Sequence, residues 1–392
     1  MKNKLLLFLL VGLVSCKPST QTKTDVPEYP LPVVDVNAEY PLKALEANRL
    51  AEVIYIPLSK KSSKGKQDYY TSFLGTVSKD WIISYTHEGD VEIFEHAGVK
   101  QCSFNRMGSA DEEYYYIFSL LWDEANREIW IADMFNRFKI YTLDGNFQRV
   151  VQYPDSLKIK IYEPYTADSL LCYDNYLVAD GLNKNSYPFF LLSKTNGEVK
   201  TIESVRVSQR IDNSERLIMN LDGKQQVLNF VLSTSPFVVN GDRMVLADYA
   251  QDTIFYRQHE TVYPLFARKP SVYASLPFIL SSMEFMTSRY LFFSFVEKSQ
   301  SRDRFYRDLL FDFATQSFFR YELLNTDFQP SLALFTNMVY GNYPSGWLVN
   351  EMGAERFLKC HREGKLKGKA AEVAEKMKGT DTCVLILYKF HE

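Results

Sequence analysis

The chain has 392 residues, with 45 lysines and arginines against 48 aspartates and glutamates, and a formal net charge of -3 at pH 7. The charges are scattered along the chain, which argues against a nucleic-acid partner because a basic face is missing. Hydrophobic residues make up 46% of the chain and aromatic residues 15%, a composition that excludes intrinsic disorder and predicts a large core.

Residues 1–15 predict a lipoprotein signal peptide. Lys2 and Lys4 precede an apolar run over 5–14, and the small residue Ser15 stands directly before Cys16. The run is about half the ~20 residues that span a bilayer, which argues against the alternative of a transmembrane anchor. We expect Cys16 to carry the lipid that attaches the mature protein to the membrane.

Residues 16–32 predict a lipidated, flexible tether. The segment 17–24 has no large apolar residue, and prolines follow at positions 27, 30 and 32. Such a composition cannot bury enough surface to offset the entropy of ordering. The folded domain is therefore expected over residues 33–392.

A repeated apolar pattern predicts the architecture of this domain. The copies are Trp81–Tyr85, Ile129–Asp133, Tyr176–Asp180, Met244–Asp248, Tyr290–Ser294 and a sixth candidate at 347–350. Each copy is typical of a buried strand, and intervals of 46 to 48 residues separate the ends of three pairs of copies. This period is close to the ~40 to 50 residues of a propeller blade.

Within one copy, the strands predict an antiparallel meander. Strands over 129–133, 137–143 and 147–153 are joined by short turns, one of which is Asp144-Gly145. Asn196-Gly197 is a second dipeptide suited to a two-residue hairpin. The sequence therefore predicts an all-β, six-bladed propeller of four-stranded antiparallel blades, and we expect a monomer because a closed ring leaves only short sheet edges.

Two segments depart from the repeat. The interval from Asp180 to Asp248 is 68 residues, about twenty longer than the others, and 208–220 predicts an extra loop or short helix, with or without a binding role. Residues 366–377 predict one short amphipathic helix, which we place on the rim of the last blade rather than on a membrane surface. Strands over 33–36, 51–58 and 382–390 are expected to close the ring by joining both ends of the domain.

Four cysteines remain beyond the lipidated one, in a compartment where disulfides persist. Cys360 and Cys383 flank the predicted helix and are a candidate disulfide, which requires Cα atoms within ~7 Å. No C-x-x-C pair exists, and the five histidines lack ligand spacing, so no metal site is predicted.

One loop is the candidate ligand-binding surface. It brings Arg106, Asp111, Glu112, Glu113 and Tyr114 beside an aromatic run that ends at residue 116. Aromatic rings and charged groups together suit sugars or peptides. The alternative is that the arginine pairs with a carboxylate and holds a turn between blades.

The recurring aspartates at 133, 180 and 248 invite a reading as catalytic groups or calcium ligands. Because they recur at equivalent positions, they are more simply side chains that accept backbone hydrogen bonds after a strand. No Gly-x-Ser-x-Gly elbow and no phosphate-binding glycine loop is present. No catalytic residue and no cofactor is therefore predicted.

Three stretches, 35–58, 129–147 and 372–390, resemble the six-bladed β-propeller lipoproteins of Bacteroides-type bacteria, which are similar to TolB-like and NHL-type propellers. The chain departs from the family pattern at Ser109-Ala110-Asp111, where relatives have a turn with glycine and proline. In relatives, acidic residues just after the lipidated cysteine accompany export to the cell surface. The first acidic residue here is Asp25, so we expect an outer-membrane anchor that faces the periplasm.

The resemblance implies a fold more than an activity. We expect a non-catalytic binding or scaffold propeller at the cell envelope, with a glycan, a peptide or an envelope protein as partner. The alternative is a calcium-dependent hydrolase or lactonase with its site in the central channel, since other six-bladed propellers include such enzymes. A calcium site would need several oxygen ligands that converge on one point.

Overall fold

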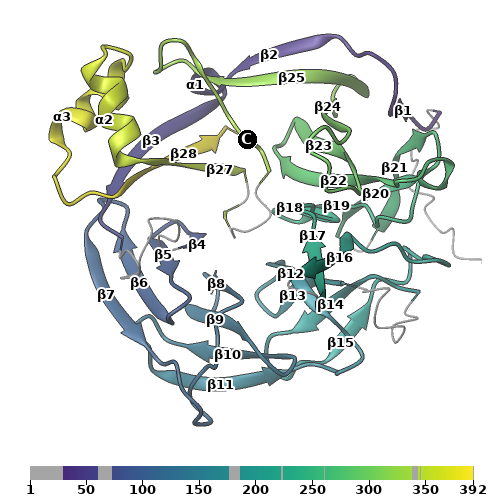
Figure 1. Ribbon diagram of the computed structural model, residues 1–392, viewed down its shortest axis with the longest axis horizontal. Helices are drawn as coiled ribbons and strands as arrows, with labels where there is room; N and C mark the ends of the chain where they lie inside the picture. Colours follow the sequence, from purple (N-terminus) through teal and green to yellow (C-terminus); the bar gives the residue numbers. More distant parts are fainter. Residues whose placement is uncertain are drawn as a thin grey trace, which may run out of the picture. The chain divides into compact units, whose positions relative to one another are not determined.

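Six antiparallel sheets stand around a common axis in residues 31–392 and form a six-bladed β-propeller (Figure 1). The computed structural model describes residues 30–60, 73–175, 186–221, 224–259, 261–337, 343–344 and 346–391. The predicted signal peptide, Cys16 and the tether up to residue 29 lie outside these residues. The predicted all-β, six-bladed architecture is confirmed.

The first three blades are four-stranded meanders that run from the innermost to the outermost strand. They consist of β4 (Phe73–Val77), β5 (Trp81–Tyr85), β6 (Asp90–Glu95) and β7 (Lys100–Asn105); β8 (Ser119–Asp123), β9 (Glu128–Asp133), β10 (Arg137–Tyr141) and β11 (Phe147–Gln152); and β12 (Ile159–Pro164), β13 (Ser169–Asp174), β14 (Phe189–Ser193) and β15 (Val199–Thr201). Gly145 and Gly197 have φ of 75° and 73°, the left-handed conformation that the two predicted hairpin turns require.

Blades four and five each carry an additional strand from the N-terminal part of the domain. Their strands are β18 (Phe237–Asn240), β19 (Arg243–Leu246), β20 (Thr253–Gln258) and β21 (Thr261–Lys269); and β22 (Ile279–Met286), β23 (Tyr290–Glu297), β24 (Tyr306–Asp312) and β25 (Ser317–Asn325), with β26 (Leu332–Ala333) on β25. The 3-10 helix η2 (Val272–Ala274) lies between the two blades in the chain. Strand β1 (Val33–Asp35) pairs parallel with β21, and β2 (Leu42–Glu46) pairs parallel with β25. The expectation that 33–36 joins the closing blade is therefore wrong.

The sixth blade closes the ring with strands from both ends of the domain. Strand β28 (Cys383–Phe390) lies between β27 (Trp347–Gly353) and β3 (Ala51–Leu58), which follows the short helix α1 (Ala47–Leu50). All eight residues of β28 pair antiparallel with β3, and the six residues from Cys383 to Tyr388 are buried. The predicted closure by residues 51–58 and 382–390 is confirmed.

Two helices connect β27 to β28. The predicted helix is α3 (Gly368–Lys376), and the structure adds α2 (Ala354–Arg362) before it. Phe357 and Ala370 bury their side chains in the apolar cluster beneath the last blade, so the predicted packing against this blade is confirmed. Among the described residues, no helix is long and apolar enough to cross a membrane.

The extra segment between blades three and four is a β-hairpin, so the expected loop or short helix is wrong. Strands β16 (Ser214–Leu221) and β17 (Lys224–Val231) pair over eight positions. The sequence of β16 mixes apolar and polar residues without a clear period. Its pairing partner β17 begins at residue 224, beyond the segment 208–220 that was expected to hold the extra loop or helix. Ile218 and Val227 face each other across the hairpin and are both exposed.

Most copies of the repeat are the second strand of a blade, namely β5, β9, β19 and β23. The copy at 176–180 lies outside the described residues, and the second strand of blade three is β13, which ends at Asp174. The candidate at 347–350 begins β27, which is the first strand of blade six within the described residues. The period is therefore informative for the copies that the structure describes.

Apolar side chains fill the spaces between the blades. In the described part of the chain, six clusters of buried residues each join two neighbouring blades around the ring. Trp130 and Phe138, for example, pack in the cluster between blades two and three. Each fully buried large side chain contributes about 1.5–3 kcal/mol, so the blades hold one another rigidly and position the residues on the axis.

Candidate functional site

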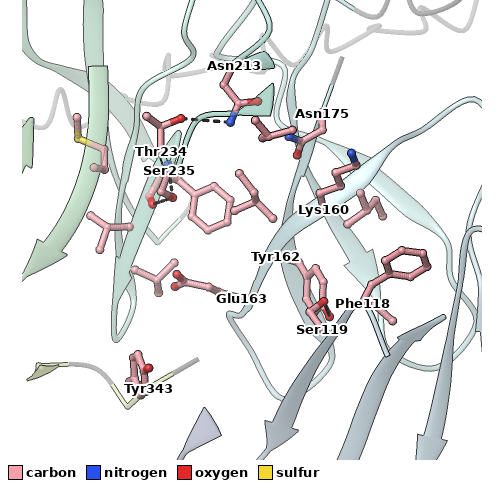
Figure 2. Close-up of a pocket in the computed structure, with 18 of the residues that line it drawn as sticks. Phe118, Ser119, Lys160, Tyr162, Glu163, Asn175, Asn213, Thr234, Ser235 and Tyr343 are labelled. Carbon is pink, nitrogen blue, oxygen red and sulfur yellow. Dashed lines mark hydrogen bonds between the residues drawn. The ribbon is translucent and has the colours of Figure 1, made fainter. Parts of the chain in front are cut away.

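A cavity of about 620 Å³ lies at the centre of the ring, enclosed by inner strands and the loops that lead into them (Figure 2). Every blade borders it, from Tyr85 of blade one to Trp347 of blade six. Its volume is within the ~300–1,000 Å³ typical of pockets that bind small molecules. We take this cavity as the candidate site.

Strand β12 of blade three provides a charged wall of the cavity. The strand places Lys160, Tyr162 and Glu163 in the wall of the cavity, and Tyr162 is the buried one of the three. The Tyr162 hydroxyl lies 2.7 Å from the Ser119 hydroxyl of blade two, which fixes the strand beside its neighbour. In Figure 2, Lys160 lies in the upper part of the wall and Glu163 below it.

Asn175 lines the cavity directly after β13. Its backbone N–H donates to the Lys158 carbonyl at 2.7 Å, so it lies beside the start of β12. The residue is only 4% exposed, yet among the described residues its side-chain oxygen Oδ1 has no hydrogen-bond partner. A buried acceptor without a partner costs about 1–3 kcal/mol.

Glu163 is an acid held in its neutral form. Burial raises the pKa of Glu163 to about 8, while a hydrogen bond from the Val239 backbone N–H opposes this rise. The carboxyl group points into the cavity (Figure 2). At neutral pH it is mostly protonated and can donate as well as accept.

A second acid, Glu284 of β22, borders the cavity from blade five. It accepts hydrogen bonds from Thr336 Oγ1 at 2.5 Å and from the Tyr306 hydroxyl at 3.3 Å. Burial, with the nearby Asp308 carboxylate, raises the pKa of Glu284 to about 7. The cavity thus contains two carboxyl groups that titrate near neutral pH.

The wall between blades three and four is polar but internally satisfied. The Asn213 side-chain nitrogen donates to the Leu232 carbonyl at 3.1 Å and to Thr234 Oγ1 at 3.2 Å (Figure 2). The Ser235 hydroxyl donates to the Phe237 carbonyl at 2.7 Å. These hydrogen bonds fix the side chains of this wall and occupy their polar atoms within the protein.

Four aromatic rings of blade two lie at or beside the cavity, and all but the half-buried Tyr116 are exposed. We define the aromatic platform as Tyr115, Tyr116, Phe118 and Phe135. Phe118 and Phe135 line the cavity and are 59% and 62% exposed. The Tyr116 and Phe118 ring centroids are 5.0 Å apart, and those of Tyr115 and Phe135 are 5.9 Å apart. The platform offers apolar ring surface directly beside the polar cavity.

The turn that presents Phe135 is strained. Phe135 and Asn136, between β9 and β10, have φ of 68° and 52°, a conformation favourable for glycine and unfavourable for a bulky side chain. Strain of this kind costs about 1–3 kcal/mol and is concentrated at functional sites. An exposed phenylalanine therefore occupies a position where glycine would have a lower backbone conformational energy.

The predicted ligand-binding loop lies next to the platform, but its five candidate residues do not line the cavity. The Tyr114 side chain is buried; its hydroxyl donates to the Gly89 carbonyl at 2.6 Å and accepts the Arg106 N–H at 3.0 Å. The Arg106 side chain donates to the Gly145 carbonyl at 3.0 Å. These contacts hold blades one and two together.

The acidic part of the loop also makes local contacts. Glu113 accepts the Ala110 N–H at 2.9 Å, and the Asp111 and Glu112 carbonyls accept from Lys139 and Tyr141. The carboxylates of residues 111 and 112 belong to exposed residues. The loop therefore reaches the candidate site through the aromatic residues that follow Tyr114.

The recurring aspartates have structural partners. Asp133 accepts the Tyr115 N–H at 3.0 Å and pairs with Arg137 at 2.9 Å. Asp248 accepts the Ala250 N–H at 2.9 Å, as expected of a side chain that caps a turn. Asp180 lies outside the described residues. For the two described aspartates, the structural interpretation is confirmed.

The candidate disulfide is absent. Cys360 and Cys383 are free cysteines, as are the other two described ones. Cys383 belongs to the cluster between blades six and one, whereas Cys360 packs against the cluster between blades five and six. The sheet of the last blade thus separates the two side chains.

No group of three or more histidine, cysteine, aspartate or glutamate side chains that could hold a metal ion is found in the part of the chain that the structure describes.

Sequence reasoning missed the residues of the cavity wall, Lys158, Lys160, Glu163 and Asn175. One signal was available in the segment 159–163, Ile-Lys-Ile-Tyr-Glu, which places charged residues on the innermost strand of a blade. Asn175 has no such signal, because no local feature of the sequence places it beside the start of the innermost strand of blade three.

No family model and no curated protein matches the chain. A protein of Bacteroides fragilis described as exported has a similar solved structure, with a TM-score of 0.56 and 13% identity over 90% of this chain and 100% of that chain. The N-terminal domain of Nup159 has a TM-score of 0.41 and 9% identity over 83% and 77% of the two chains. Virginiamycin B lyase from Staphylococcus aureus has a TM-score of 0.29 and 12% identity over 56% and 75%. At these identities the first likeness shows the propeller fold alone, and the other two add no argument.

Proposed function

We propose that this chain is an envelope lipoprotein whose propeller binds a glycan in its central cavity without catalysing a reaction. The observation that carries the proposal is the aromatic platform beside a cavity with polar walls. Sugar rings present apolar faces that stack on aromatic rings, while their hydroxyl groups need hydrogen-bond partners. Both kinds of surface meet at the mouth of this cavity.

The strain at Phe135 supports the same proposal. The ring is 62% exposed, and in the free protein it contacts the Arg137 guanidinium, 5.3 Å from its centroid, and the Tyr115 ring. A role in stacking against a ligand explains why the turn carries phenylalanine. A peptide is the other ligand class that this surface suits, and it is an outcome of the test below.

Anchoring through a lipid on Cys16, with the domain in the periplasm, belongs to the proposal. The signal-like residues 1–15 support it, as does the similar fold of an exported Bacteroides fragilis protein. A protein tethered in this way would hold glycans near the outer membrane for other envelope proteins. Protease treatment of intact cells would degrade the protein if it faced outward instead.

The test is a thermal-shift screen of the full chain, solubilised in detergent, against neutral and acidic oligosaccharides and short peptides. A ligand that binds only the native state stabilises it by about 2.7 kcal/mol at 100 times its dissociation constant. We expect a glycan to raise the melting temperature, and Phe118→Ala with Phe135→Ala to abolish the shift. Phe335→Ala is the matched control, because Phe335 is exposed but does not line the cavity. Stabilisation by peptides alone would contradict the proposal.

A hydrolase is the second candidate, and the two acids of the cavity favour it. Groups whose pKa lies near the working pH are suited to general acid and base roles, and Glu163 and Glu284 meet this condition. Calcium dependence would require further oxygen ligands. Release of shorter sugars from a bound oligosaccharide, lost in Glu163→Gln, would replace the binding proposal with this one.

A further inference from the structure

The hairpin of β16 and β17 has two open edges. Each strand pairs with the other over eight positions and with no further strand among the described elements. No described residue outside the hairpin forms a backbone hydrogen bond with residues 215–231. The expectation of a monomer depends on the short edges of the blades, whereas the hairpin adds an edge of eight residues with unpaired N–H and C=O groups.

Both faces of the hairpin carry exposed apolar side chains. Val227 lies opposite Ile218, and Val231 shares their face because it is four residues further along the strand. Phe230 lies on the other face. These four side chains are 40% to 59% exposed, and none of them belongs to a buried cluster of the described domain. A two-stranded hairpin is marginally stable in water, so this one needs further strands or a packed face.

Strand β17 has the edge that is better suited to accept another strand. Its residues 225–231, Gln-Gln-Val-Leu-Asn-Phe-Val, contain no charge and no proline, and the ladder has no bulge. Charges, prolines and bulges are the features that keep open edges from pairing with another chain. In contrast, β16 carries Glu215 and Arg216. The edge of β17 therefore favours a polypeptide strand as its partner, since such a strand supplies the matching N–H and C=O groups.

We propose that β17 pairs antiparallel with β17 of a second copy of this chain, so that two hairpins form one four-stranded sheet across a two-fold axis. A fitting partner strand is uncharged, about seven residues long and apolar on both faces, and β17 itself meets these conditions. Antiparallel pairing places the two Lys224 residues at opposite ends of the sheet, about 20 Å or more apart. A parallel arrangement would place these equal charges side by side, which is destabilising.

This arrangement brings each hairpin to the cavity of the other copy. The base of the hairpin is fixed, since the Leu232 N–H donates to the Asn213 carbonyl at 2.9 Å and Asp212 pairs with Lys298 at 2.5 Å. Val231, at the end of β17, lines the cavity of its own copy. In an antiparallel pair this end lies beside the start of the other β17, so the tip of one hairpin lies at the rim of the other cavity.

The experiment is sedimentation equilibrium of the full chain in a density-matched detergent, over a range of protein concentrations. We expect a reversible dimer of twice the monomer mass. Val227→Lys should weaken dimerisation by about 10- to 100-fold, because a lysine on an edge strand opposes pairing. Val99→Lys is the matched control, since both valines are 51% exposed but Val99 lies in the turn between β6 and β7. Thermal unfolding verifies that both variants are folded.

Cross-linking tests the direction of the pairing. When the two strands overlap fully, a two-fold axis places residue 227 or 228 opposite its own copy. A short bis-maleimide should therefore join Val227→Cys into a covalent dimer, whereas Lys224→Cys should remain monomeric because its two copies lie at opposite ends. The unmodified chain, which has free cysteines of its own, gives the background.

Three outcomes would overturn the inference. A monomer at every concentration would refute the dimer and leave the edge of β17 to a strand of another protein. A dimer that Val227→Lys does not weaken would place the interface elsewhere on the molecule. Cross-linking of Lys224→Cys as strongly as of Val227→Cys would refute the antiparallel arrangement. None of these results depends on the proposed glycan binding, which the thermal-shift screen tests separately.

Discussion

Asp174 and Asn175 are consecutive residues, but their side chains differ in whether they have polar partners within the described protein. The Asp174 carboxylate accepts the Lys158 N–H at 3.0 Å and lies 3.9 Å from the Arg210 guanidinium, which also binds the Asp174 carbonyl at 2.6 Å. The Asn175 side-chain oxygen has no partner among the described residues. The Asp174 side chain therefore takes part in holding blades three and four together, whereas no described residue donates to the neighbouring Asn175 oxygen.

The paired region should be the more sensitive to mutation. Arg210 is buried and bridges blades three and four, since it also lies 3.4 Å from the Asp248 carboxylate. Arg210→Met would leave two buried carboxylates without their cation and should lower the free energy of unfolding by about 3–5 kcal/mol. Urea denaturation measures this loss, and Lys200→Met should change stability by less than about 0.5 kcal/mol. A loss below 1 kcal/mol for Arg210→Met would show that the bridge is not structural.

A substitution of Tyr114 tests whether the predicted ligand-binding loop serves the contacts between blades or the binding of a ligand. Tyr114→Phe removes a hydroxyl that satisfies both the Gly89 carbonyl and the Arg106 N–H. We expect a loss of about 1–3 kcal/mol in urea denaturation, because two buried backbone groups lose their partner. Glycan affinity should stay unchanged. A drop in affinity without a loss of stability would instead place Tyr114 in the binding site.

The cavity acids predict a pH dependence of stability. The pKa of Glu163 rises to about 8 and that of Glu284 to about 7 in the folded protein, above the ordinary value of 4.5. The native state therefore binds more protons than the unfolded state between these values, so stability falls as pH rises from about 5 to 8. We expect Glu284→Gln to reduce this fall by about 1–2 kcal/mol, an amount that allows for water in the cavity. An unchanged slope in urea denaturations across this range would contradict the shift.

Strain at the platform predicts a mutation that removes function without weakening the fold. Phe135→Gly relieves an unfavourable φ of 68° and loses a side chain that is 62% exposed. Stability should stay constant or rise by up to about 1 kcal/mol, while glycan affinity falls. Phe335→Gly is the control, because Phe335 is also exposed but has no positive φ, so it should lose stability and retain affinity. A clear loss of stability in Phe135→Gly would mean that the ring serves the fold.

The same contrast explains what the sequence could reveal. The blades were predictable because strand periodicity and turn dipeptides such as Asp144-Gly145 depend on local chemistry. The parallel pairing of β1 with β21 was not, since it joins residues more than 200 positions apart without a local signal. The second strand of the hairpin insertion was missed for a related reason, because a strand is defined by its partner.

The site was less visible than the fold. Its aromatic platform was partly anticipated, since the predicted loop runs into Tyr115 and Tyr116. Asn175 and Lys160 become a pair only when β12 and the end of β13 lie side by side, which requires the correct register of blade three. No local feature of the sequence fixes this register, so the sequence alone does not bring the two residues together.

The smallest expected effect on stability is at Asn175 itself. Removing one member of a satisfied pair is costly, whereas replacing an unpaired buried polar atom with an apolar group of similar size is nearly neutral or stabilising. Asn175→Leu should therefore change the free energy of unfolding by less than about 1 kcal/mol in urea denaturation, while Asp174→Leu at the adjacent position loses several kcal/mol. If Asn175→Leu were as damaging as Asp174→Leu, the Asn175 oxygen would have a structural partner in the folded protein.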